Sequence, residues 1–311
     1  MNYINIFGLE LTINPVAFTL PFGNGWSVYW YGIIISAGFA LAVVYGLFRA
    51  KKFGLNTDNL LTGILVTSVF SILFGRAYYI IFSESVTFKE FLNIHDGGMA
   101  IPGAIIGAVL VGALMCRILK LDLLSTFDLM SIGFLLGQGI GRWGNFINQE
   151  AYGSFTGSNW FGMTGDKISS EVFSTQLVHP CFLYESVWCL IGFVLFHFIS
   201  KHRKFKGELG CLYMIWYGVE RAVVEGLRTD ALMLGSVRIT QWLMVLVAVA
   251  GIILFYFGYK KQNKTLTAKS EEYVDQFDSI DEKFESDDEV LVSTLGIVDK
   301  EYLDSLNDSD E

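Results

Sequence analysis

The sequence predicts an all-α polytopic membrane protein with about seven transmembrane helices and a small external head region. The first observation is composition: 52% of the 311 residues are apolar and only 17% are charged, whereas soluble domains have about 25% charged residues. The second is a mean hydropathy of +0.46. The third is a series of apolar runs with the length, about 20 residues, that crosses a bilayer.

Seven apolar runs are long enough to form transmembrane helices. The aromatic fraction of 15% is high, and Trp and Tyr are favoured at membrane interfaces. The predicted spans are Trp26–Phe48, Asn59–Phe82, Met99–Leu119, Leu123–Gly141, Pro180–Ser200, Leu209–Leu227 and Val237–Tyr259.

Two segments outside these runs belong to the predicted head region and the membrane surface. Residues 154–176 are polar and rich in Gly and Ser, so we expect an external loop or small head. The first twenty residues lack a basic region followed by an apolar stretch and a cleavage site. We therefore expect no removable signal peptide, and a short amphipathic piece that rests on the membrane.

Cationic residues alternate between loops and predict the orientation. They gather after the first, third, fifth and seventh spans, while the other loops hold few. Because cytoplasmic loops carry the excess of Lys and Arg, the N-terminus is predicted outside and the C-terminus in the cytoplasm. The cations that carry this prediction are Arg49, Lys51, Lys52, Arg117, Lys120, Lys201, Arg203, Lys204, Lys206, Lys260, Lys261 and Lys264.

The C-terminal segment differs from the rest of the chain in composition. Much of the acidic charge lies there, in runs such as EEYVDQFDSIDEKFESDDE. We predict a transmembrane catalytic domain over 1–262 and a solvated, disordered acidic tail over 263–311; a short partner-binding helix in the tail is the alternative. The sequence has no basic patch of the kind that binds nucleic acid.

The four cysteines predict neither a disulfide framework nor a metal site. All lie in or beside apolar runs and none forms a CxxC pair, so we interpret them as small buried apolar residues. They are Cys116, Cys181, Cys189 and Cys211.

Four arginines lie in or at the outer ends of predicted spans. An arginine at the bilayer centre costs roughly 2.5–3.5 kcal/mol on the insertion scale, so each needs a reason. Each taken alone is explained by snorkelling or by an internal ion pair. Together they indicate an anion site, because the guanidinium fork suits phosphate. These arginines are Arg76, Arg142, Arg221 and Arg238.

The stretch 217–228 places an arginine among possible partners. Tyr217, Arg221 and Glu225 are spaced four apart and share a helical face, with Arg228 near the same side. The alternatives are a structural ion pair that lets Arg221 insert, and an arginine held ready for an anion. Glu220 is interpreted as a pairing partner with no wider role.

The stretch GQGIGRWGNFINQE, residues 137–150, ends an apolar run with polar side chains. Arg142, Asn145 and Asn148 are spaced three apart, and Glu150 follows. The glycines permit close approach of a neighbour or a lipid head group. We therefore predict a polar pocket for a head group here.

Two further candidates have simpler alternatives. His179 precedes Pro180, which suits the first turn of a helix, and a histidine there is commonly a cap or surface residue. Tyr31 lies in the SVYWYG stretch that opens the first span, where an aromatic-belt anchor is the alternative.

With these motifs assembled, the chain resembles the prolipoprotein diacylglyceryl transferase family from about Val28 to Tyr259. The most specific match is GRWGNFINQEAYG at 141–153. Supporting matches are WYG at 30–32, GR at 75–76, DGGMAI at 96–101, HPCFLYE at 179–185 and YGVERAVVEGLR at 217–228.

The resemblance implies a seven-span enzyme of the bacterial plasma membrane with an external head. It implies that phosphatidylglycerol gives its diacylglyceryl group to the lipobox cysteine in the signal peptide of a prolipoprotein, and that glycerol phosphate leaves. No cofactor or metal is expected. One departure matters: Pro102 stands where many family members carry a proton-transferring His or Tyr.

On this basis the site residues receive expected roles. Arg142 and Arg221 would bind the phosphate, with Glu225 holding Arg221. The proton acceptor is left open between Glu150, His179 and the field of the arginines, because Pro102 can neither take nor give a proton. The other residues expected to bind substrate are Tyr31, Arg76, Asn145, Asn148, Gly153, Tyr217 and Arg228.

Other classes of function fit the pattern less well. An anion transporter would continue its charges across the membrane, whereas here they gather toward one leaflet. A seven-span receptor has no need of GRWGNFINQE at the end of a span, and a scaffold has no need of arginines in lipid.

Overall fold

The structure is a computed structural model that describes residues 2–21, 26–82, 91, 98–229, 233–234 and 237–286. The chain divides into two units, Met1–Gly258 and Tyr259–Glu311. The first unit contains a bundle of long helices and a small head built on strands, and it holds every predicted site residue.

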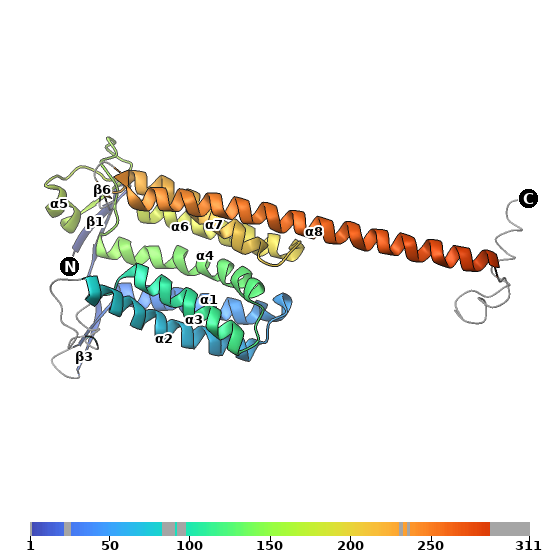
Figure 1. Ribbon diagram of the computed structural model, residues 1–311. Coiled ribbons are helices and arrows are strands. Elements are labelled where there is room, and N and C mark those ends of the chain that lie inside the picture. Colours follow the sequence, from blue (N-terminus) through green and yellow to red (C-terminus); the bar gives the residue numbers. More distant parts are fainter. Residues whose placement is uncertain are drawn as a thin grey trace, which may run out of the picture. The chain divides into compact units, whose positions relative to one another are not determined.

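Long helices make up the bundle, which confirms the predicted all-α membrane fold. Six helices in the described ranges are long and apolar enough to cross a membrane. Figure 1 shows α1 to α4 and α6 to α8 running alongside one another within the first unit, and α4 packs against α1, α6 and α7 while α2 packs against α3. The long helices are α1 Trp30–Ala50, α2 Thr57–Phe82, α3 Ile101–Ile118, α4 Leu123–Asn148, α6 Cys181–Ile199, α7 Glu208–Leu227 and α8 Ile239–Ser286.

Two helices differ from the predicted spans in an informative way. Helix α4 ends at Asn148, not at Gly141, so Arg142 and Asn145 lie on regular helix. Helix α7 has 20 residues but is not among the six apolar helices, because its sequence includes charged side chains. The bundle thus buries a seventh helix whose polar face points to its neighbours.

A buried carboxylate on α4 fixes the N-terminal end of α7. Asp128 has no exposed surface. Its Oδ2 accepts from the Gly207 amide at 2.8 Å and from Arg203 Nη1 at 2.9 Å, and its Oδ1 accepts from the Gly210 amide at 2.9 Å. These bonds satisfy the free amides at the start of α7, so the register of α7 against α4 is set at this end.

The head is formed by strands and one short helix. β1 Asn2–Ile6 lies between β2 Leu9–Ile13 and β5 Met163–Gly165, antiparallel to both. β3 Val16–Leu20 pairs with β4 Trp26–Tyr29, and β6 Met233–Leu234 pairs with β7 Val237–Arg238. Helix α5 spans Asp166–Val172, and short 3₁₀ turns, η1 Lys51–Phe53 and η3 Ser200–His202, follow α1 and α6.

Residues 2–20 therefore form the strands β1, β2 and β3 of the head, in place of the expected amphipathic piece resting on the membrane. The turn between β1 and β2 has positive φ at both Phe7 and Gly8, 51° and 83°. Two-residue hairpin turns require this conformation. The core of the head includes Ile4, Met163 and Phe182, so the strands pack on the ends of the bundle.

Gln149 joins the head to the end of α4. It is fully buried and takes positive φ, 53°, just after the helix. Its Nε2 donates to the Tyr3 carbonyl at 3.1 Å, and its Oε1 accepts from the amides of Lys167 at 2.9 Å and Ile168 at 3.3 Å. The side chain thus caps the first turn of α5, whose own preceding residue, Gly165, has no side chain to do so.

The tail has more helix than the sequence suggests. Helix α8 continues to Ser286, where the sequence predicts disorder from 263 onward. Residues 260–286 contain no Gly or Pro and are rich in Lys, Glu and Gln, which are good helix formers. The domain boundary at 262 stays a prediction, and residues 287–311 lie outside the described ranges.

Helices α2 and α3 approach closely at small residues, as is usual between membrane helices. A Cβ atom added at Gly103 would lie 2.5 Å from the Phe74 carbonyl oxygen, and it would also collide with Tyr78 Cβ. Pro102, in the first turn of α3, suits a helix start and leaves no titratable side chain there.

We predict that Gly103→Ala lowers the free energy of unfolding by about 1–3 kcal/mol, because the added methyl group overpacks this contact. Gly112→Ala on the same helix is the matched control, since the nearest atom to its new Cβ, Thr67 Cγ2, is 3.7 Å away. Thermal unfolding in detergent measures both. An equal gain of stability in the two variants, as helix propensity alone would give, would contradict the close approach.

Candidate active site

Three helices meet at one buried carboxylate. Glu185 on α6 forms ion pairs with Arg142 on α4, from Nη2 to Oε2, and with Arg221 on α7, where Nη1 and Oε1 are 2.6 Å apart. Arg221 also pairs through Nη2 with Glu225 Oε2 at 2.7 Å, one turn further along α7. We call Arg142, Glu185, Arg221 and Glu225 the arginine cluster.

Burial makes these pairs strong and mutually dependent. The side chains of Glu185 and Glu225 are 1% and 5% exposed, while those of Arg221 and Arg142 are 12% and 21% exposed. Unpaired buried charges are costly, and charge-assisted contacts to two guanidinium groups offset that cost for Glu185. Arg142 is the most accessible member, so the cluster is closed on the Glu225 side and most open at Arg142.

The packing of α4 on α6 sets Arg142 opposite Glu185. Beside Arg142, Trp143 Nε1 donates to Ser186 Oγ at 3.1 Å. Ser186 Oγ in turn donates to the Gly139 carbonyl at 2.7 Å, one turn earlier on α4. A Cβ at Gly139 would lie 2.9 Å from Leu190 Cδ2, so the glycine allows the helices to come this close.

A row of polar side chains lies next to the arginine cluster, deeper in the bundle. Tyr217 stacks on Tyr213 with ring centroids 5.6 Å apart, and it interacts electrostatically with Arg142 and Arg221. The Tyr213 hydroxyl accepts from Gln138 Nε2 at 3.0 Å. Tyr217 therefore lies close enough to both guanidinium groups to interact with their charge.

The last turns of α4 carry the predicted amides. Asn145 and Asn148 are partly buried and lie one and two turns beyond Arg142. Tyr31 packs on Gly144, where a Cβ would lie 2.7 Å from the ring, and it interacts electrostatically with Arg142 and Glu150. These side chains extend the polar surface from the arginine cluster toward the head.

Glu150 belongs to the head end of this surface. Its Oε1 is 3.3 Å from Lys167 Nζ, and its side chain is 42% exposed. Such an exposed pair contributes little stability. Among the described contacts Glu150 thus pairs with Lys167 of the head and not with a member of the arginine cluster.

Gly153 is where three chain segments cross. Its amide donates to the His179 carbonyl at 2.9 Å, and it forms a β-bridge with Arg228. A Cβ there would lie 2.8 Å from His179 Cβ and 3.0 Å from the Leu227 carbonyl oxygen. The glycine is therefore needed for the close packing of these segments.

This crossing brings His179 and Arg228 to the same end of the bundle as the arginine cluster. His179 Nδ1 is 3.1 Å from the Tyr184 hydroxyl, and Arg228 interacts electrostatically with Arg221. Both side chains are partly buried.

The other two of the four arginines make their described contacts with backbone carbonyls and not with side chains of the arginine cluster, and the expected gathering of all four toward one leaflet stays a prediction. Arg76 is 3% exposed, and it donates from Nε to the Phe91 carbonyl at 3.3 Å and from Nη1 to the Gly98 carbonyl at 2.8 Å. Arg238 Nη1 donates to the carbonyls of Glu225 and Gly226 at the end of α7. Their guanidinium groups satisfy backbone carbonyls, a local role that sequence spacing does not reveal.

Glu185 is the residue that the sequence analysis missed as the centre of the site. It appears only inside the HPCFLYE stretch, and its two partners lie on other helices. A carboxylate in an apolar run was the available signal, because such a side chain needs a buried cation.

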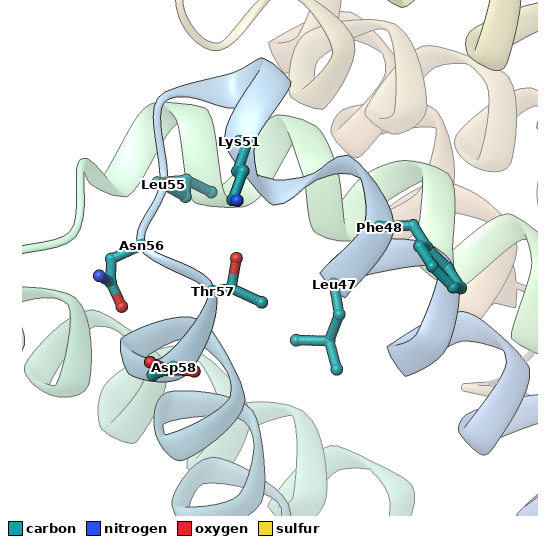
Figure 2. A pocket seen from close by; sticks show the side chains of 7 residues that line it. All are labelled: Leu47, Phe48, Lys51, Leu55, Asn56, Thr57 and Asp58. Carbon is teal, nitrogen blue, oxygen red and sulfur yellow. The ribbon is translucent and has the colours of Figure 1, made fainter.

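A different hollow, with a volume of about 690 Å³, lies between the end of α1 and the start of α2; Figure 2 shows the side chains that line it. It is lined by Leu47, Phe48, Lys51, Leu55, Asn56, Thr57 and Asp58. None of the predicted site residues lines it. Among the described residues, no group of three or more His, Cys, Asp or Glu is placed to hold a metal ion.

Residues 15–257 match the model of a family described as prolipoprotein diacylglyceryl transferase. A protein of Clostridium novyi (strain NT), named phosphatidylglycerol–prolipoprotein diacylglyceryl transferase, is 38% identical over 257 residues, which cover 81% of this chain and 99% of the relative. Proteins of the same name from Finegoldia magna and Clostridioides difficile (strain 630) are 39% and 34% identical, over 80% and 82% of this chain and 97% and 99% of their own lengths.

We predict that Glu185→Gln lowers the free energy of unfolding by about 3 kcal/mol or more, because two largely buried guanidinium groups lose their shared, fully buried counter-charge. Glu10→Gln, the same change at an exposed head residue, is the matched control. Unfolding of both variants in detergent provides the measurement. An unchanged midpoint for Glu185→Gln would show that the arginines do not depend on this carboxylate.

Proposed function

The chain belongs to the prolipoprotein diacylglyceryl transferase family, and from this premise we propose that its arginine cluster binds the phosphate of the lipid donor during transfer. The observation that carries the proposal is the meeting of Arg142 and Arg221 on Glu185 inside a membrane bundle.

The activity is transfer of the diacylglyceryl group of phosphatidylglycerol to a prolipoprotein, the first step of lipoprotein maturation. We propose that the acceptor is the lipobox cysteine. Its sulfur forms a bond to a glycerol carbon, the bond from that carbon to a phosphate oxygen breaks, the electron pair stays on the leaving glycerol phosphate, and the thiol proton is released. Negative charge therefore grows on the phosphate as the bond breaks.

The arginine cluster suits this charge development. A guanidinium has five N–H donors, and among the described contacts Arg142 uses only Nη2 for Glu185. Its remaining donors and its 21% exposure leave it able to receive a phosphate. Fixed cations in a site sheltered from water stabilise a developing anion strongly, and Glu185 and Glu225 hold Arg221 in place for this task.

The residues toward the head are assigned to the rest of the donor. Asn145 and Asn148 supply amide groups for the glycerol and phosphate oxygens, and Tyr31 and Tyr217 lie near Arg142. Gly153 keeps the crossing segments at His179 and Arg228 close together. Arg76 is not assigned to the donor, since its guanidinium holds the segment before α3.

The thiol of the acceptor cysteine in the prolipoprotein, whose unperturbed pKa is about 8.5, must lose its proton. The candidates are Glu150, His179 and the field of the arginines, which favours the thiolate. Pro102 excludes the position at the start of α3 from this step.

We place the protein in the bacterial plasma membrane with its N-terminus outside and the arginine cluster near the outer leaflet. The basic loops support this orientation, and the relatives come from bacteria. Signal peptides would then reach the site from the membrane.

We predict that Arg142→Ala and Arg221→Ala each reduce transfer by at least about a hundredfold, as removal of one oxyanion-stabilising donor does. The assay follows label from phosphatidylglycerol into a lipobox peptide. Arg117→Ala is the control, because Arg117 is exposed at the end of α3.

Membrane insertion of each variant is checked in the same preparation. Wild-type turnover by an inserted Arg142→Ala or Arg221→Ala variant would contradict the proposed phosphate site. The assay also tests the transporter and receptor alternatives, because only a transferase produces a lipidated peptide.

A further inference from the structure

Glu220 is a buried carboxylate next to the arginine cluster to which no role has been assigned. It lies on α7 and is 5% exposed. Among the described residues neither of its carboxylate oxygens has a hydrogen-bond partner. An ionised carboxylate left without partners in such a place is very costly, so burial favours the neutral form.

Charged and titratable groups surround Glu220 from three helices. On α4 the charged group is Arg142, on α6 it is Glu185, and on α7 it is Arg221. The remaining titratable neighbours are Cys189 on α6 and Tyr213 and Tyr217 on α7. Both arginines already make ion pairs with Glu185 or Glu225. Glu220 is therefore a third carboxyl group beside only two guanidinium groups.

The charge balance of the site depends on Glu220. Arg142 and Arg221 contribute two positive charges, and Glu185 and Glu225 contribute two negative charges. With neutral Glu220 these five side chains carry no net charge. With ionised Glu220 they carry one net negative charge, which offsets the positive charge of Arg228 near Arg221 and so weakens the attraction for a singly charged phosphodiester.

We propose that Glu220 carries a proton when the lipid donor binds, and that this proton sets the affinity of the arginine cluster for the donor phosphate. The inference rests on the proposed phosphate site and adds a positioning residue to it. Glu220 acts through Arg142 and Arg221: when it loses its proton, it competes with the phosphate for their charge. Affinity for the donor therefore falls as pH rises.

The test is equilibrium binding of short-chain phosphatidylglycerol to the full chain in a non-ionic detergent. No acceptor peptide is present, so the thiol does not contribute to the pH dependence. The pH range runs from about 6 to about 9, where buried glutamates titrate. For the wild type we expect the Kd to rise about tenfold across this range.

Glu220→Gln keeps the shape and removes the titration. We expect its Kd to stay constant across the range, near the wild-type value at low pH. Glu10→Gln is the matched control and should follow the wild type, because Glu10 is an exposed residue of the head.

A second measurement uses the wild type alone and does not depend on the folding of a variant. Calorimetry at about pH 8 in two buffers of different ionisation enthalpy counts the protons taken up when the lipid binds. By linkage, a site that prefers protonated Glu220 takes up protons on binding. No uptake would overturn the inference, as would identical pH dependence in the wild type and a folded Glu220→Gln variant.

The two proposals fail in different ways. If Arg142→Ala binds phosphatidylglycerol as the wild type does, the phosphate site itself is wrong. If binding requires Arg142 but does not change with pH, the phosphate site stands and the role of Glu220 is wrong.

Discussion

The structure of the site depends on one carboxylate shared by two guanidinium groups. Glu185 draws Arg142 from α4 and Arg221 from α7 onto α6. In a membrane bundle this arrangement offsets the cost of each buried charge. It also places two guanidinium groups on one carboxylate, one of them still partly accessible. The same contact thus joins three helices of the bundle and supports the phosphate site that we propose.

Other features hold this contact in register. At the far end of α4, Asp128 fixes the start of α7. Near the site, Trp143 and Ser186 hold α4 on α6. At the head, Gln149 joins the end of α4 to β1 and α5. Helix α4 is therefore anchored along its length, which suits a site that must be rigid before charge develops in it.

The features that could be predicted from the sequence are those set by residues near one another in the chain. Apolar runs located the long helices, and the four-residue interval predicted the pair of Arg221 and Glu225. The central role of Glu185 depends on partners from two other helices, which spacing within one helix cannot show. Arg76 was expected to bind substrate, but its described contacts are with backbone carbonyls, which spacing in the sequence does not reveal either. The strands of the head were missed although the alternation in LELTI, residues 9–13, is long enough to indicate a strand, because the segment was interpreted as an amphipathic piece on the membrane.

The central claim is that Arg142 and Arg221 act as one unit on one phosphate. A double-mutant cycle in kcat/KM for phosphatidylglycerol, with Arg142→Gln, Arg221→Gln and the double variant, tests it most directly, since residues that act together are strongly non-additive. We expect the double variant to be about as slow as the slower single variant. Losses that multiply independently would contradict the account.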